Sequence, residues 1–433
     1  MLAVPTRTLA AMGLLIITLG LTTAPATAAD WWRITTVDVE NAGGYNSMAI
    51  LPSGQPAISY YGSDEDLRYA WFDGDAWQVT TVESNGNVGL WTGLAILPSG
   101  QPAISYHDLT NADLKYAWLE GDTWHTTIVD SDGDVGRCSS LAILPTGHPA
   151  ISYYSDALHA LKYAWFDGST WQTTVADNEG ITGYYTSLAI LPSGQPAISY
   201  MEMGVTWDLK YAWFDGVTWQ RTFVDTEGNV GRWTSLAVLP SGHPAISHYR
   251  YNNGTEDVRY AWFDGVDWHN EIVDTPTALP TDTSLAILSS GHPAMTYHHI
   301  FTLRYAWFDG IDWQVLTVPG ARVEGVDVSL VILPVDHPAI AYCQGAGVLQ
   351  VALHRASGDV NGDGLVDADD INPFIQSLAG EAAFHAHYPE SDWLSADCNN
   401  DGRVDFDDIN PFALLLADQP RRDAAISTGV HRE

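Results

Sequence analysis

One short segment recurs seven times along this 433-residue chain, and it limits the possible folds more than any other feature. In its third copy, which starts at Ser140, the segment reads SLAILPTGHPAISYY. The copies begin at Ser47, Gly93, Ser140, Ser187, Ser235, Ser284 and Ser329, which gives spacings of 46, 47, 47, 48, 49 and 45 residues. A period of about 40–50 residues with several strand-like segments per unit is typical of a β-propeller and not of a helical solenoid.

Each repeat divides into four strand-like segments. In the third copy these segments span residues 141–144, 150–154, 161–166 and 171–175. The first is almost wholly apolar, as expected for a strand that is covered on both faces. Asp167-Gly168, between the third and fourth segments, predicts a tight hairpin turn in which both residues take a positive φ. We therefore predict an all-β fold built from four-stranded blades.

Tryptophan recurs at two fixed positions of the repeat, one in the third strand and one in the fourth. A Trp side chain buries about 200 Å², so packing between neighbouring blades is the preferred interpretation, with ligand binding as the alternative. The positions are 71, 118, 165, 213, 262 and 307 in the third strand and 77, 124, 171, 219, 268 and 313 in the fourth.

The seventh repeat lacks its fourth strand, and the missing piece lies at the other end of the chain. No Asp-Gly turn and no Trp follow the third strand of this repeat, at 349–353. Residues 32–38, WRITTVD, match residues 171–177 of the third repeat position by position. Because a shared last blade would remove the exposed edges of an open array, we predict a seven-bladed propeller over residues 30–357 that the N-terminal strand closes.

The pattern LKYAxxDGxxW, present at 161–171, resembles bacterial propeller repeats that are grouped with the BNR repeats of sialidases. This resemblance implies the fold and leaves the activity open, because propellers carry many functions. Asp167-Gly168 lacks the residue that separates Asp from Gly in a sialidase Asp-box.

Two stretches near the C-terminus share the spacing of a twelve-residue calcium loop. Each offers oxygen ligands at positions 1, 3, 5, 9 and 12, a backbone carbonyl at position 7 and a turn glycine at position 6. The predicted ligands are Asp359, Asn361, Asp363, Leu365, Asp367 and Asp370 in the first loop and Asp397, Asn399, Asp401, Arg403, Asp405 and Asp408 in the second. Because an acidic tail without function would have to produce this register twice, we predict two bound calcium ions.

Aspartate at position 12, with a helix only after each loop, resembles a type I dockerin. The resemblance implies a small α-helical module over residues 358–417, with helices at 371–378 and 409–416, that binds a cohesin domain in a calcium-dependent way. It also implies a link to polysaccharide-degrading enzymes. Ala368-Asp369 and Phe406-Asp407 occupy positions 10 and 11, where cellulosomal dockerins often carry small hydroxyl residues, so the particular cohesin stays open.

The N-terminal residues 1–28 have the layout of a secretory signal peptide. Arg7 precedes an apolar run at 9–21, and Ala26-Thr27-Ala28 forms a cleavage site. The run is too short to span a bilayer, which takes about 20 residues. We therefore predict a secreted or cell-surface protein with no membrane span, and a disordered tail at 418–433.

The formal net charge of −35 argues against nucleic acid and anionic membrane as partners, since both repel such a surface. The three cysteines are an odd number, so at least one thiol stays unpaired within the chain. Cys138 and Cys343 fall on the third and seventh blades, too far apart to form a disulfide.

The connections before the first and third strands of each repeat vary, and in an up-and-down blade they emerge on the same face, which is the candidate ligand surface. Seven residues just before the first strand would surround the central channel there: Tyr45, Trp91, Cys138, Tyr185, Trp233, Asp282 and Asp327. Four aromatic rings and two carboxylates would suit a sugar. The alternative is that these side chains only fill the channel.

Catalysis has less support in the sequence. Asp282 and Asp327 form the single carboxylate pair that the repeat alignment brings near the channel, and a glycosidase needs a pair about 5–10 Å apart. Most arginines occupy the same third-strand position as lysines of other repeats, which indicates a structural role. His107, His248, His298 and His299 stand near the end of the second strand, where Tyr is usual, and are interpreted as aromatic substitutes. The favoured function is a tethered propeller that binds carbohydrate or protein; the alternative is a glycoside hydrolase or polysaccharide lyase.

Overall fold

The computed structural model describes residues 30–417 apart from positions 40–42, 75, 205–206, 253, 277–279, 325–326, 335–336, 346, 357, 362–365, 367, 389–390, 392 and 399–402. The predicted signal peptide and the predicted C-terminal tail lie outside the described residues.

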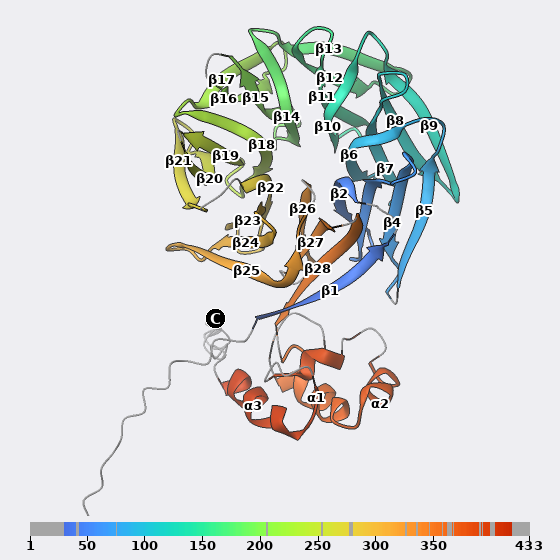
Figure 1. Ribbon diagram of the computed structural model, residues 1–433, viewed down its shortest axis with the longest axis vertical. Helices are drawn as coiled ribbons and strands as arrows, with labels where there is room; N and C mark the ends of the chain where they lie inside the picture. The colour runs from blue at the N-terminus through green and yellow to red at the C-terminus, as the bar shows by residue number, and fades with distance from the viewer. Residues whose placement is uncertain are drawn as a thin grey trace, which may run out of the picture.

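Seven four-stranded antiparallel sheets form a ring of blades around a central channel (Figure 1). The blades are numbered from the first repeat, so that blade one contains β2, β3, β4 and β5. The first strand of each blade lies nearest the channel and the fourth forms the outer edge. The predicted all-β, seven-bladed fold is confirmed.

The strands follow the repeat from blade to blade. Blades one to three are β2 (Gly44–Ile50), β3 (Pro56–Tyr61), β4 (Leu67–Phe72), β5 (Trp77–Glu83); β6 (Val88–Ile96), β7 (Pro102–Asp108), β8 (Asp113–Glu120), β9 (Thr123–Asp130); and β10 (Val135–Ile143), β11 (Pro149–Ser155), β12 (Ala160–Phe166), β13 (Trp171–Asp177). Blades four and five are β14 (Ile181–Ile190), β15 (Pro196–Met203), β16 (Trp207–Phe214), β17 (Trp219–Asp225); and β18 (Asn229–Val238), β19 (Pro244–Asn252), β20 (Thr255–Phe263), β21 (Trp268–Asp274). Blades six and seven are β22 (Pro280–Ile287), β23 (Pro293–His299), β24 (Thr302–Phe308), β25 (Trp313–Arg322); and β26 (Val328–Leu333), β27 (His337–Gln344), β28 (Val348–Ala356), β1 (Asp30–Asp38).

The N-terminal strand completes blade seven, as the sequence predicted. Strand β1 pairs antiparallel with β28 from Asp30, opposite Ala356, to Asp38, opposite Leu349. Figure 1 shows the two strands side by side at the rim of the ring. The chain therefore closes its ring with hydrogen bonds between its two ends.

The hairpin between the third and fourth strands differs in detail from the prediction. In blade three the loop spans four residues, and the N–H of Asp167 donates to the carbonyl of Thr170 (3.1 Å). Gly168 alone of the two turn residues has a positive φ, of 102°. Asp167 instead accepts hydrogen bonds from the N–H groups of Ser169 and Thr170 through Oδ1. The prediction of a positive φ at Asp167 is wrong because the aspartate caps the turn with its side chain.

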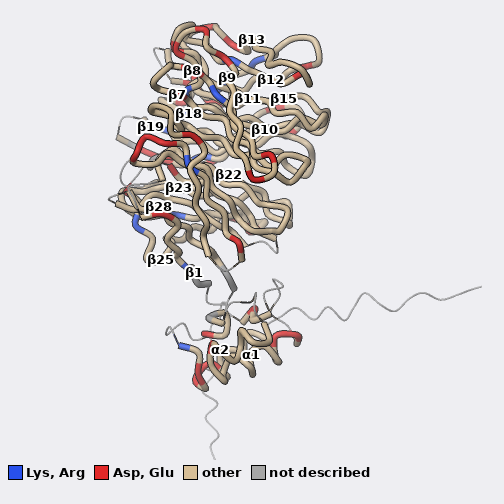
Figure 2. Tube along the Cα trace, turned by 90° about the vertical axis from the view of Figure 1, so that its right-hand side faces the viewer, with Lys and Arg blue, Asp and Glu red and all other residues tan. Residues whose placement is uncertain are grey.

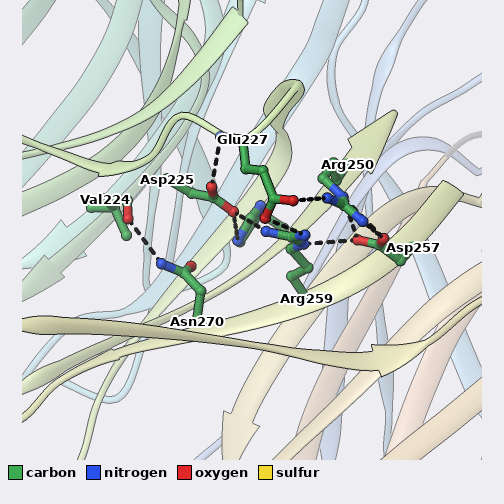
Figure 3. A network of polar contacts seen from close by, with 8 residues as sticks. Val224, Asp225, Glu227, Arg250, Asp257, Arg259 and Asn270 are labelled. Carbon is green, nitrogen blue, oxygen red and sulfur yellow. Dashed lines mark hydrogen bonds and ion pairs between the residues drawn. The ribbon is translucent and has the colours of Figure 1, made fainter. Parts of the chain in front are cut away.

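Neighbouring blades are joined by buried ion pairs. The third-strand cation of one blade reaches the carboxylate that ends the fourth strand of the preceding blade, as when Lys210 Nζ approaches Asp177 Oδ2 to 2.6 Å. At the junction of blades four and five, Arg259 contacts Asp225 (2.7 Å), Glu227 (3.0 Å) and Asp257 (2.8 Å) (Figure 3). These contacts support the structural role that the sequence assigned to the third-strand cations.

The C-terminal module is helical and built on an internal duplication. Its helices are α1 (Ile371–Ser377), α2 (Glu381–His385) and α3 (Ile409–Ala417). The sequence DDINPF precedes or opens both α1 and α3, and the rings of Phe374 and Phe412 stack with their centroids 4.0 Å apart. The predicted helices at 371–378 and 409–416 are confirmed within one residue, and α2 is an addition.

Acidic residues occur on both the ring and the module, and basic residues on the module are few (Figure 2). All three cysteines are free thiols, and Cys398 is buried in the core of the module. Among the described residues, no helix is long and apolar enough to cross a membrane.

Candidate functional site

The central channel opens into a cavity of ≈ 480 Å³ that all seven blades line. The structure brings together every residue that the repeat placed there: Tyr45, Trp91, Cys138, Tyr185, Trp233, Asp282 and Asp327. They lie at the channel end where the connections vary in length. The cavity is therefore bounded by one side chain from the same position of each repeat.

A strained backbone aims these side chains into the channel. Six of the seven residues have φ between 49° and 56°, in the left-handed region that bulky residues rarely adopt. In blade three the pairing of β10 with β11 slips between Arg137 and Ser140, so Cys138 forms part of a bulge. These six residues lie within the first strands and not before them, as the sequence had suggested, whereas Asp327 directly precedes β26. Bulges re-aim side chains, and such strain is often found at functional sites.

A collar of hydrogen bonds holds the bulges in place. Thr92 donates through Oγ1 to the carbonyl of Tyr45 in the preceding blade (2.7 Å), and Thr234 donates likewise to the carbonyl of Tyr185 (3.0 Å). The same link recurs from Ser139, Thr186 and Thr283. The sequence analysis missed this collar, although its signal is visible: Ser or Thr follows the channel residue in five repeats.

The aromatic rings form two pairs around the opening. The ring centroids of Tyr45 and Trp91 are 5.0 Å apart, and those of Tyr185 and Trp233 are 5.2 Å apart. Cys138 lies between the pairs in blade order, and burial raises the pKa of its thiol to about 11, so the thiol is protonated at neutral pH. The opening thus presents flat apolar surfaces together with a neutral thiol.

The two carboxylates stand on the neighbouring blades six and seven. Asp282 accepts the N–H of Val328 (2.6 Å) through Oδ2, and Asp327 accepts the N–H of Tyr45 (2.5 Å) through Oδ2. Burial raises the pKa of Asp327 to about 6. Burial, together with repulsion from Asp327, raises the pKa of Asp282 well above its usual range. At least one of the two therefore holds a proton near neutral pH and can donate a hydrogen bond.

Arg232, which was not predicted as a site residue, stands beside the opening. The guanidinium of Arg232 lies 4.1 Å from the ring centroid of Trp207 and 5.7 Å from that of Trp233. Such cation–π contacts fix an arginine against aromatic rings. Arg232 directly precedes the channel residue Trp233 in the sequence, and this position could have indicated its place beside the opening.

The four histidines singled out in the sequence are buried in second strands. His107 packs against Trp91, with ring centroids 5.5 Å apart, and its Nδ1 lies 2.8 Å from the carbonyl oxygen of Val135. His248, His298 and His299 are likewise buried. Burial lowers the pKa of all four, so they are neutral at pH 7. The interpretation as aromatic substitutes fits His107, His248 and His298, which stand where other blades carry Tyr. It is wrong for His299, whose strand register matches that of Ser155 in blade three.

The calcium loops are described in part. Asp363, Leu365, Asp367, Asn399 and Asp401 lie outside the described residues. The position-12 carboxylate of the first loop, Asp370, accepts the N–H groups of Val360 (2.7 Å) and Asn361 (2.9 Å). Its counterpart Asp408 accepts the N–H groups of Cys398 (2.8 Å) and Asp405 (2.9 Å). In both loops the last ligand therefore folds back onto the first residues.

Buried aspartate side chains in both loops fit a divalent cation. The side chains of Asp359 and Asp397, at position 1 of the two loops, are 2% and 8% exposed, and those of Asp370 and Asp408 are fully buried. Concentrating buried carboxylates in this way is costly unless a cation is present, and hard oxygen ligands suit calcium. Arg403 lies at position 7, where the backbone carbonyl is the ligand, so its positive side chain does not conflict with the site.

The module contacts blade seven at the end away from the variable connections, and it lies beside the rim of the ring near β1 and β28 (Figure 1). Nε2 of His337, which begins the second strand of blade seven, lies 3.7 Å from Oδ2 of Asp359. His337 pairs with Leu333 at the end of the blade that lies far from the channel residue Val328. The module therefore leaves the channel opening uncovered.

The fold is a seven-bladed propeller followed by a helical module with two loops that have the spacing of calcium loops. Residues 357–410 match the family model of the dockerin type I domain, and the C-terminal module is a dockerin of this type. Dockerin type I domains bind calcium. No curated protein matches the chain significantly.

Several solved structures resemble the chain at low identity. A PL25 ulvan lyase bound to -[GlcA(1-4)Rha3S]- aligns with a TM-score of 0.53 and 14% identity over 73% of this chain and 95% of the lyase. A protein of unknown function from Dyadobacter fermentans gives 0.48 and 12% over 75% and 99%. The six-bladed Aleuria aurantia lectin gives 0.42 and 14% over 67% and 100%. The likeness to the lyase concerns the propeller fold.

Proposed function

We propose that this protein is an exported carbohydrate-binding propeller that its dockerin attaches to a cohesin, for use in extracellular polysaccharide breakdown. The observation that carries the proposal is the convergence of Tyr45, Trp91, Tyr185 and Trp233 with a carboxylate pair on one cavity. Sugar rings stack on aromatic faces, while their hydroxyl groups need nearby acceptors and donors.

The chemistry of the cavity favours a sugar over a protein segment. Its volume of ≈ 480 Å³ lies within the usual range of small-ligand sites, about 300–1,000 Å³. Asp282 and Asp327 supply hydrogen-bond acceptors and, through their raised pKa values, at least one donor. The collar of hydrogen bonds keeps the four aromatic residues in place before a ligand arrives, which lowers the entropy cost of binding.

The dockerin would hold two calcium ions, one per loop, with the ligands predicted from the spacing. The module contacts blade seven at His337, far from the channel opening. This attachment would direct a bound cohesin away from the face that carries the variable connections. Tethering would then occur at the rim of blade seven, away from the channel opening.

A second function, a secreted glycoside hydrolase or polysaccharide lyase, is favoured by one observation. A carboxyl group with a pKa near 6 beside a second carboxyl group is suited to act as a general acid. In that case Asp282 and Asp327 would face the bond that is cleaved.

An oligosaccharide array with the full chain in calcium tests the proposal. We expect retention of at least one glycan class, lost in Trp91→Ala and kept in Phe406→Ala, an exposed change on the dockerin. Incubating each bound glycan with the protein separates the two functions, because only an enzyme would release new reducing or unsaturated ends. Binding that Trp91→Ala leaves unchanged would contradict the channel as the site.

A further inference from the structure

Two large clefts lie between blades, away from the channel. The cleft between blades three and four has a volume of ≈ 820 Å³ and is lined by Trp165, Trp219 and Phe214. The cleft between blades four and five has a volume of ≈ 650 Å³ and is lined by the equivalent Trp213, Trp268 and Phe263. Both clefts reach the turns between the first and second strands and between the third and fourth strands, which are nearly identical from repeat to repeat and are called the constant turns here. The constant turns lie on the face opposite the channel opening.

The aromatic frame of these clefts recurs at six of the seven junctions. At each one, a buried third-strand Tyr stacks beside the Trp of its own strand, with centroids 5.5–5.8 Å apart and planes at 19–22°. The same Tyr meets the fourth-strand Trp of the next blade edge-on, at 5.2–5.6 Å and 64–66°. The central tyrosines are Tyr69, Tyr116, Tyr163, Tyr211, Tyr260 and Tyr305.

The seventh junction shows that the ring closes without this frame. In blade seven, Val351 and Leu353 take the positions of Tyr163 and Trp165, since Ala339 pairs with Leu353 as Ala150 pairs with Trp165. These two aliphatic side chains belong to the hydrophobic cluster against which Trp77 of blade one packs. Packing alone therefore does not require two tryptophans per junction. The fourth-strand Trp can be kept while the third-strand Trp becomes Leu.

The tryptophans are also less buried than packing residues need to be. The central Tyr163 and Tyr211 are each 5% exposed, whereas Trp165, Trp213, Trp219 and Trp268 all remain partly accessible. Polar side chains stand around them: Gln195, Thr218 and Arg221 at the first cleft and His243 and Asp267 at the second. Indole faces beside amide, hydroxyl, imidazole and charged groups are suited to stack on a pyranose ring and bind its hydroxyls.

We propose that the clefts between blades are a second class of glycan-binding site, separate from the channel and repeated around the ring. Each cleft binds one pyranose unit between the third-strand Trp of one blade and the fourth-strand Trp of the next. Repetition makes the ring multivalent, so that weak single sites act together on a polymer. The constant turns, which are alike from repeat to repeat, then give every site the same frame.

Native mass spectrometry of the full chain tests this proposal. The probe is a panel of methyl glycosides of glucose, galactose, mannose, xylose, fucose, rhamnose and glucuronic acid, at increasing concentration. We expect several copies of one sugar per chain. Trp165→Leu with Trp213→Leu should reduce that number by two, and because Leu353 occupies the same position in blade seven, the double variant should still fold.

Two further variants complete the design. Trp77→Leu removes a Trp at the junction that lacks the aromatic frame, and should leave the number of bound sugars unchanged. Val217→Arg, at a side chain that is 81% exposed and lines the first cleft, should remove one site without touching the core. A single bound sugar that is lost in Trp91→Ala and kept in the double Leu variant would overturn this proposal and leave the channel site standing. If no methyl glycoside binds and no oligosaccharide on the array is retained, both the channel site and the sites between blades are overturned.

Discussion

Tyr153 of blade three donates a hydrogen bond of 2.7 Å to Oδ2 of Asp130, the last residue of blade two. Lys162, from the next strand of blade three, contacts the same carboxylate oxygen. Burial would raise the pKa of Asp130, but the hydrogen bonds from Lys162 and Tyr153 more than offset it, and its pKa lies below the usual range. One buried carboxylate thus joins two blades through two partners.

Replacing Lys162 with Met should destabilise the ring strongly. The change leaves Asp130 buried without its cation, and breaking a buried pair in this way typically costs about 3–5 kcal/mol. Equilibrium unfolding in guanidinium chloride measures the loss. The matched double variant Lys162→Met with Asp130→Asn should be less destabilised than the sum of the single changes. A cost below about 0.5 kcal/mol, the size of an ordinary surface change, would contradict the role of the pair.

The sequence revealed the ring because repetition aligns seven copies of one unit. The split last blade followed from matching Trp32 to Trp171, which needs no knowledge of side-chain packing. Repetition could not reveal the left-handed backbone at Trp91 and its counterparts, because a bulge depends on how the strand pairs. The clefts were missed for a similar reason: a recurring Trp looks the same in sequence whether it is fully covered or half open.

His248 interrupts the tyrosine pattern, and its buried ring should make the protein sensitive to acid. Neither ring nitrogen is within hydrogen-bond distance of a partner, although Nε2 lies 3.8 Å from Oδ2 of Asp225. Burial lowers the pKa of the imidazole to about 4 and outweighs the attraction of Asp225. The unfolded chain takes up this proton near pH 6.5 and the folded chain does not. Stability is therefore full above pH 6.5 and falls as the pH drops towards about 4, by at most about 1.4 kcal/mol per pH unit.

His248→Tyr should remove this loss of stability at acid pH, because Tyr restores the residue found in blades three and four and cannot take up the proton. Thermal unfolding of both proteins between pH 4 and 7.5 gives the comparison, with His387→Gln, a change at an exposed histidine of the C-terminal module, as control. Equal pH slopes in the wild-type protein and His248→Tyr would show that the imidazole is not buried as described.

The channel carboxylates should have the opposite pH dependence. The pKa of Asp327 is raised to about 6, so the folded chain holds a proton that the unfolded chain releases near pH 4. Stability from this group is present below about pH 4 and is lost as the pH rises through about 6. Asp327→Asn keeps an oxygen for the N–H of Tyr45 and should stabilise the protein at pH 7.5 by on the order of 1 kcal/mol, since the channel is partly solvated.

Unfolding midpoints at pH 4 and pH 7.5 measure this effect. The gain should appear at pH 7.5 and vanish at pH 4, where Asp327 is already protonated. Asp122→Asn, at an exposed turn residue of blade two, serves as the control. Destabilisation by Asp327→Asn at pH 7.5 would show that the carboxylate is held by a cation or another partner.

Each calcium loop should lose its ion when its last ligand is removed. Asp408 and Asp370 occupy the same position of the two loops, and each ties the loop start to the following helix through backbone hydrogen bonds. Asp408→Ala removes both a ligand and these bonds, so calorimetric titration of the full chain should fall from two calcium ions to one. Asp370→Ala should do the same, and Asp407→Ala, the exposed neighbour of Asp408, should leave two. Because the stacked Phe374 and Phe412 join the two halves of the module, the remaining site should also weaken. Two ions bound with unchanged affinity in Asp408→Ala would contradict the assignment of this loop.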